Sequence, residues 1–119
     1  MQKVLMIIND APYGTEKSYN ALRLAMALQK EHREDTKVAV FLLADGVFCG
    51  LANQKTPTGY YNIERMLKSV LQHGGEVNCC GGCMEARSLL ESSMIDGVAK
   101  SNVKELAQMT VDSDKVLCF

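Results

Sequence analysis

Short apolar runs alternate with segments of helical period along this chain. The runs at residues 4–8 and 38–44 are continuously apolar, which is typical of parallel strands that are covered on both faces. Between them, residues 15–34 place Ala21, Leu24, Ala25 and Leu28 on one face, the pattern of an amphipathic helix. The first third of the chain therefore predicts a strand, a helix and a second strand.

The rest of the chain continues this alternation. Residues 47–53 predict a short helix and residues 55–61 a loop, and Asn62 can cap a helix with an apolar stripe from Ile63 to Leu71. Residues 76–80 predict a third strand, and a helix is expected from Cys83 to Glu91. A short strand at 97–99, a helix opened by a capping box at Asn102 and a strand at 115–119 complete the pattern. The expected apolar face of that last helix consists of Val103, Leu106, Ala107, Thr110 and Val111.

Strands that alternate with helices predict an α/β fold, here a three-layer α/β/α sandwich with a mainly parallel five-stranded sheet of flavodoxin/Rossmann-like type. The chain has 119 residues and no internal repeat or linker, so we expect one domain over residues 1–119. A flavodoxin-like strand order would make the first and third strands neighbours. The loop at residues 9–14 would then face the segment that follows the third strand.

Charge and composition argue against several classes of function. The formal net charge is −1 and no basic cluster is present, which disfavours nucleic acid or an acidic membrane as a partner. The longest apolar run is far shorter than the roughly 20 residues of a membrane span, and the N-terminus lacks the pattern of a secretion signal, so we expect a cytoplasmic protein. Five cysteines, an odd number, argue against a disulfide framework.

Three of the cysteines, Cys79, Cys80 and Cys83, follow one another where the third strand is expected to end. Chemistry in parallel sheets collects at the carboxyl ends of strands. Gly81 and Gly82 allow a sharp turn from strand to helix beside the Cys80 sulfur. A helix N-terminus favours a thiolate, and Arg87 adds a positive charge nearby, so the sequence predicts that Cys80 is a nucleophile.

Four interpretations of this cluster compete. Cys80 can carry sulfur as a persulfide, or Cys80 and Cys83 can cycle between thiols and a disulfide. The cysteines can instead bind a metal, or they can be small buried side chains in a tight turn. Metal is the weakest interpretation, because a closed zinc site needs four ligands and the chain has a single C-x-x-C pair, with neither histidine close to it in sequence. We expect no metal site and no cofactor.

Outside the cluster, a second set of residues is a candidate for ligand binding. Asn9, Tyr13 and Gly14 lie in the loop after the first strand and join Gly81 and Gly82 in this set, although a simple turn uses similar residues. The glycine spacing of a dinucleotide fingerprint is absent. We expect Cys49 to be a small, partly buried filler and Cys118 to lie in the core.

Motifs along nearly the whole chain resemble those of one known family. They include Ala11-Pro12-Tyr13-Gly14, Asn20-Ala21-Leu22-Arg23, Gln54-Lys55, Tyr61-Asn62-Ile63, the Cys80-x-x-Cys83 pair with Arg87, Ile95-Asp96-Gly97-Val98 and Asp114-Lys115-Val116-Leu117. In this order they resemble the DsrE/DsrF-like proteins, and within them the YchN-like branch. Cys79 departs from the pattern, which has an ordinary strand residue there.

The resemblance implies the α/β/α fold already predicted and a homo-oligomer or hetero-oligomer, often a hexamer. It also implies a sulfur relay, in which Cys80 matches the cysteine that accepts sulfur as a persulfide and Cys83 matches the second cysteine of the branch. The expected function is that of a sulfur carrier, a sulfurtransferase only in a loose sense, with donor and acceptor proteins as partners. The alternatives are a dithiol redox protein or redox sensor, and an oligomeric ligand-binding or scaffold protein.

Overall fold

The computed structural model describes all residues from 1 to 119. Five strands form one sheet in which every pairing is parallel. They are β1 (Gln2–Ile8), β2 (Thr36–Leu42), β3 (Glu76–Cys80), β4 (Ala99–Ser101) and β5 (Lys115–Cys118). The predicted parallel α/β class is thus confirmed, and β3 has the bounds that the sequence predicts.

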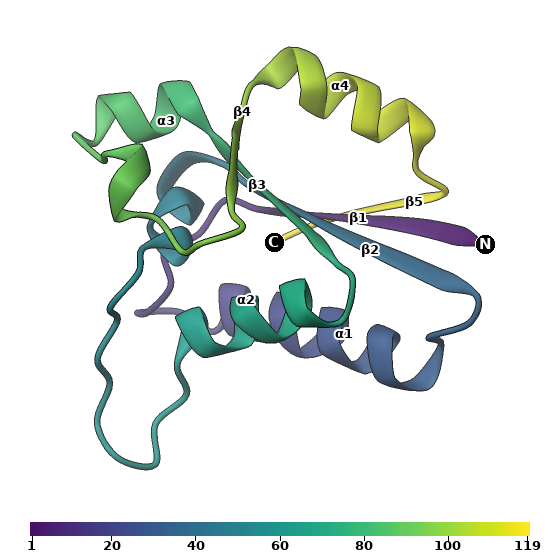
Figure 1. The fold of residues 1–119 in the computed structure, drawn as a ribbon, viewed down its shortest axis with the longest axis horizontal. Helices are drawn as coiled ribbons and strands as arrows, with labels where there is room; N and C mark the ends of the chain where they lie inside the picture. The colour runs from purple at the N-terminus through teal and green to yellow at the C-terminus, as the bar shows by residue number, and fades with distance from the viewer.

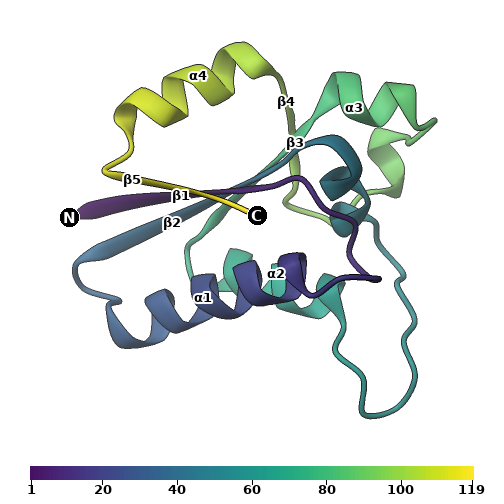
Figure 2. The same cartoon turned by 180° about the vertical axis from the view of Figure 1, so that it is seen from behind.

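Four α-helices and two short 3₁₀ helices surround the sheet (Figure 1). The helices α1 (Lys17–Glu31) and α2 (Ile63–Gln72) lie side by side on one face, and α4 (Val103–Asp112) lies over the other. At the carboxyl ends of the strands are α3 (Gly81–Ala86) and the 3₁₀ helices η1 (Ala44–Gly50) and η2 (Glu91–Ser93), as Figure 2 shows from behind. No helix is long and apolar enough to cross a membrane.

The strand order is β4-β3-β2-β1-β5. The flavodoxin-like order is therefore wrong: β3 pairs with β2, and β1 lies between β2 and β5. The point where the strand order reverses lies between β1 and β5. There the backbone N–H of Asn9 donates to the carbonyl of Phe119 at 2.9 Å. The loop after β1 consequently faces the C-terminus of the chain, and the segment after β3 faces η1.

The core is built from the strands and the inner faces of α1 and α2. Leu5, Phe41 and Leu67 are fully buried in it. The strand β2 leads directly into η1, where Gly46 packs against β1 so closely that a Cβ there would lie 2.0 Å from the carbonyl oxygen of Ile8. This contact holds η1 against the end of β1 and limits position 46 to glycine.

The C-terminal part of the chain departs most from the prediction. Cys118 is exposed, not in the core, because β5 is a short edge strand. Of the apolar residues expected to bury one face of α4, only Leu106 is buried, whereas Val103 is 62% and Val111 80% exposed. The helix expected from Cys83 to Glu91 is shorter and begins two residues earlier, at Gly81.

Candidate functional site

The candidate site begins where β3 passes into α3. Cys80 is the N-cap of α3 in extended conformation, and its Sγ accepts a hydrogen bond from the backbone N–H of Cys83 at 3.4 Å. Serine, threonine or aspartate oxygens usually make this capping contact. The three-residue spacing of the C-x-x-C pair therefore places the Cys80 sulfur on a free N–H at the start of the helix.

Cys83 lies on the first turn of α3 and contacts η1. Its Sγ accepts a hydrogen bond from the backbone N–H of Ala44 at 3.3 Å. Each sulfur of the pair thus accepts one backbone hydrogen bond. The Ala44 N–H donates to the Cys83 sulfur, and the Cys83 N–H donates to the Cys80 sulfur. Cys83 is half-buried and Cys80 only 6% exposed, so the second cysteine is the more accessible of the pair.

The surroundings of Cys83 favour its neutral thiol. Burial raises its pKa, and the contact with the Cys80 side chain raises the pKa further. The Ala44 N–H and the charge of Arg87 act in the opposite direction without reversing the shift. Because the pKa of Cys83 lies above its ordinary value, the side chain is a thiol rather than a thiolate at neutral pH.

Arg87 ties α3 to η1. Its Nε donates to the Asp45 carboxylate at 2.9 Å, and another guanidinium nitrogen donates to the Cys83 carbonyl at 3.1 Å. Both bonds are charge-assisted, which makes them stronger than neutral ones. The sequence analysis did not identify Asp45 or Ala44 as parts of the site. Their role depends on the pairing of β2 with β3, which no local pattern reveals.

The two glycines after Cys80 have different environments. A Cβ on Gly81 would lie 2.8 Å from the Cε of Lys100 and 3.3 Å from the carbonyl oxygen of Ser101, so this residue packs closely on β4. A Cβ on Gly82 would meet no atom within 4 Å. Gly82 therefore forms an open side of the segment next to Cys80.

The other predicted ligand-binding residues form no hydrogen bond with Cys80 or Cys83. Asn9 contacts Phe119, and Gly14 is exposed in a left-handed conformation with φ of 117°. The Tyr13 hydroxyl donates to Gln54 at 2.6 Å and accepts from the N–H of Ile63 at 3.1 Å. The structure thus brings together Cys80, Cys83, Arg87, Gly81 and Gly82, and it places Asn9, Tyr13 and Gly14 elsewhere.

Two further cysteines are buried behind the site. Cys49 and Cys79 have no exposed surface, and burial raises the pKa of each to about 12. A thiol with such a pKa is inert as a nucleophile at neutral pH. The structure contains no group of three or more histidine, cysteine, aspartate or glutamate side chains that could hold a metal ion.

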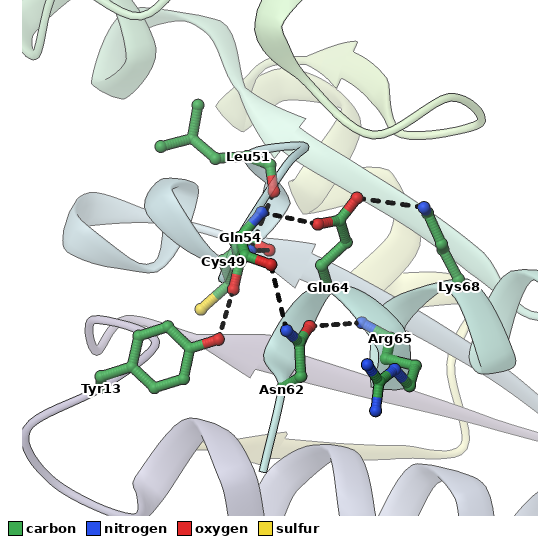
Figure 3. Close-up of polar contacts among 8 residues, drawn as sticks. All are labelled: Tyr13, Cys49, Leu51, Gln54, Asn62, Glu64, Arg65 and Lys68. Atoms are coloured by element: carbon green, nitrogen blue, oxygen red, sulfur yellow. Dashed lines mark hydrogen bonds and ion pairs between the residues drawn. The ribbon is translucent and has the colours of Figure 1, made fainter. Parts of the chain in front are cut away.

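A buried polar network anchors the far end of η1 and the loop that follows it (Figure 3). The Gln54 side chain donates to the carbonyls of Cys49 and Leu51, and its backbone N–H donates to the Glu64 carboxylate at 2.7 Å. Lys68 pairs with the same carboxylate at 3.0 Å. Burial alone would raise the pKa of Glu64, but these contacts outweigh it and lower the pKa below the ordinary value.

The family assignment follows from the whole chain rather than from the site alone. The model of the DsrE/DsrF-like family matches residues 2–119. The chain belongs to the DsrE/DsrF-like family. It is 41% identical to the protein YchN of Escherichia coli (strain K12) over 119 residues, which cover all of both chains.

A solved structure and a more distant relative extend this comparison. The crystal structure of the ychN protein from E. coli has a TM-score of 0.89 with 39% identity over the full length of both chains. The sulfurtransferase TusD of Salmonella newport (strain SL254) is 25% identical over 126 residues, covering 96% of this chain and 97% of TusD.

Proposed function

We propose that this protein carries sulfane sulfur as a persulfide on Cys80 and passes it to a partner protein. The observation that carries the proposal is the hydrogen bond from the Cys83 N–H to the Cys80 sulfur. An N–H donor at a helix start stabilises negative charge on sulfur, which a persulfide bears after transfer. The distant relative TusD, named as a sulfurtransferase, supports the same chemistry.

The transfer needs no external oxidant or reductant. The Cys80 thiolate attacks the outer sulfur of a donor persulfide, the donor S–S bond breaks, and the donor leaves as a thiolate. An acceptor thiolate then attacks the outer sulfur on Cys80 and releases the Cys80 thiolate. The open side at Gly82 is where donor and acceptor groups approach the sulfur.

Cys83 controls the release of sulfur in this proposal. As a thiolate it would attack the inner sulfur on Cys80, form a Cys80–Cys83 disulfide and expel hydrosulfide. Its raised pKa keeps it protonated near neutral pH, which slows this loss and favours delivery to a partner. Arg87 and Ala44 are the positioning groups, because they hold Cys83 in place through its carbonyl and its sulfur.

Intact-protein mass spectrometry after incubation with a small persulfide donor tests the proposal. We expect a reductant-labile gain of one sulfur atom that disappears in Cys80→Ser and remains in Cys83→Ser. Cys118→Ser is the matched control, since Cys118 is the exposed thiol outside the site. A sulfur gain that disappears only in Cys118→Ser, or no gain in any variant, would rule out carriage on Cys80.

A dithiol redox function is the second candidate. It is favoured by the contact between the Cys80 and Cys83 side chains at the start of one helix. Thiol–disulfide exchange with a partner disulfide would oxidise the pair to a Cys80–Cys83 disulfide and reduce the partner to two thiols. A loss of two hydrogens that requires both cysteines, without any sulfur gain, would favour this function over the carrier.

We also propose that the protein works as a homo-oligomer, with a hexamer as the expected form in this family. The exposed apolar side chains of Val103, Val111 and Val116 on α4 and β5 support an interface there. Sedimentation velocity of the wild type and of Val111→Glu tests this. A wild type that sediments as a monomer would exclude it.

A further inference from the structure

All four tyrosines of the chain gather on the α1–α2 side of the molecule, and no hydrogen bond joins them to Cys80 or Cys83. Tyr19 comes from α1, Tyr60 and Tyr61 from the loop before α2, and Tyr13 from the loop after β1. The Tyr61 ring stacks on Tyr19 with centroids 4.2 Å apart and on Tyr60 at 4.6 Å. These side chains form a continuous aromatic surface whose last member, Tyr60, is 50% exposed.

A hollow of about 500 Å³ opens over this surface. We call it the tyrosine groove and define it by Tyr19, Tyr60, Tyr61, Arg23, Arg65 and Met66. Its volume lies within the range of small-molecule sites. Aromatic side chains with a few polar groups are the usual lining of such sites.

The polar network described above holds this aromatic surface in place. The Tyr13 hydroxyl donates to Gln54, and Asn62 donates to the Gln54 carbonyl at 3.1 Å (Figure 3). The same hydroxyl accepts from the N–H of Ile63. The loop that carries Tyr60 and Tyr61 is therefore anchored through Asn62, the residue that directly precedes α2. A site whose lining is already ordered loses less conformational entropy when a ligand binds.

Two arginines give the tyrosine groove a positive charge. The Arg23 guanidinium lies 5.3 Å from the centroid of the Tyr19 ring, and its one side-chain hydrogen bond is to Asn20. Arg23 and Arg65 form no ion pair with any carboxylate of the chain. No acidic residue lines the groove, although Glu16 lies near enough to Tyr61 to contribute to its raised pKa.

We propose that the tyrosine groove binds a planar aromatic or heteroaromatic ring that bears an anionic group. The ring stacks on the exposed face of the tyrosine surface, as nucleic-acid bases stack on aromatic side chains. The anionic group pairs with Arg23 and Arg65, whose guanidinium groups form no ion pair within the chain and can donate to the anion in bidentate form. This site does not depend on the sulfur chemistry of Cys80.

Isothermal titration calorimetry with adenosine monophosphate and with naphthoate tests the site. We expect saturable binding of both, in the millimolar range or tighter. Adenosine lacks the charge and ribose phosphate lacks the ring, so both are expected to bind at least about tenfold more weakly.

Variants locate the binding. Arg23→Gln, Arg65→Gln and Tyr60→Ala are each expected to weaken adenosine monophosphate about tenfold. Arg33→Gln removes an exposed arginine outside the groove and is expected to bind like the wild type. Cys80→Ser must also bind like the wild type, which separates this site from the proposed carrier function.

Two results would overturn the inference. One is the absence of binding of both charged probes, or binding that the groove variants do not change. The other is a wild type that self-associates and binds no probe, combined with loss of this self-association in Tyr60→Ala or Arg65→Gln. The groove would then be a contact between copies of the chain.

Discussion

The backbone N–H of Ala44 donates a hydrogen bond to the Sγ of Cys83 across 3.3 Å. Ala44 adopts a left-handed conformation with φ of 51°, which is uncommon for a residue with a Cβ. This backbone shape at the end of β2 turns the N–H toward α3. The second cysteine of the pair is therefore held by a residue 39 positions away in the sequence.

The surroundings of Cys83 lead to a prediction about its reactivity. Only the thiolate is alkylated, and the pKa of Cys83 is raised by burial and by Cys80. We expect iodoacetamide to modify Cys83 slowly until the pH exceeds the ordinary thiol value of 9.0. In Cys80→Ala the reaction should begin at lower pH, because one cause of the raised pKa is removed.

Peptide mass spectrometry after timed alkylation over a pH series measures this. The exposed Cys118 in the same digest serves as the internal reference for the reagent. Alkylation of Cys83 at neutral pH as fast as that of a free thiol would contradict the assignment of a neutral side chain.

A second prediction concerns the tie between Arg87 and η1. Asp45 has a side chain that is 61% exposed, so Asp45→Asn is expected to cost less than about 1 kcal/mol of unfolding free energy. Arg87→Met loses the same ion pair and also the bond to the Cys83 carbonyl, and we expect it to cost about 1–2 kcal/mol. Urea unfolding of both variants measures the difference, and equal losses would show that the carbonyl bond contributes nothing.

A third prediction compares two glycines. A Cβ at position 46 would lie 2.0 Å from a backbone oxygen of β1, so Gly46→Ala is expected to cost about 3 kcal/mol or more or to prevent folding. At position 82 a Cβ meets no atom within 4 Å, and the residue lies in α3, so Gly82→Ala is expected to be neutral or to stabilise by about 0.5–1 kcal/mol. Thermal unfolding of the two variants, Gly46→Ala and Gly82→Ala, tests this prediction. A Gly46→Ala variant that is as stable as the wild type would contradict it.

A fourth prediction is a pH dependence in the buried network. The pKa of Glu64 is below its ordinary value of 4.5 because the Lys68 contact and two backbone N–H groups outweigh the effect of burial. A lowered folded-state pKa stabilises the protein above the unfolded pKa, and this stability is lost as the pH falls through the folded pKa. Glu64→Gln is therefore expected to cost about 1–3 kcal/mol at pH near 7.

The cost of Glu64→Gln should shrink as the pH falls below 4.5, because the wild-type carboxylate becomes protonated. Urea titrations at neutral and acid pH measure it. Lys68→Met is the matched variant, since it removes only the exposed partner and should cost less. A cost that is the same at both pH values would mean that the charge of Glu64 plays no part.

Hydrophobic periodicity located most elements of the fold. The helix expected at residues 15–34 is Lys17–Glu31, and the strand expected at 76–80 is Glu76–Cys80. These elements are defined by local side-chain patterns, which depend only on residues close in sequence. The pattern on α4 led to a wrong prediction, because Val103 and Val111 have the spacing of a buried helix face yet remain exposed.

The sequence by itself determined the α/β class and the position of the cysteine pair at the end of the third strand, because both follow from local period and spacing. Only the tertiary structure decided that β3 pairs with β2, so that Cys83 meets Ala44 and Arg87 meets Asp45. It alone also brought four tyrosines from three segments together. Strand order and the approach of distant loops depend on long-range packing, and no local pattern in a single chain encodes them.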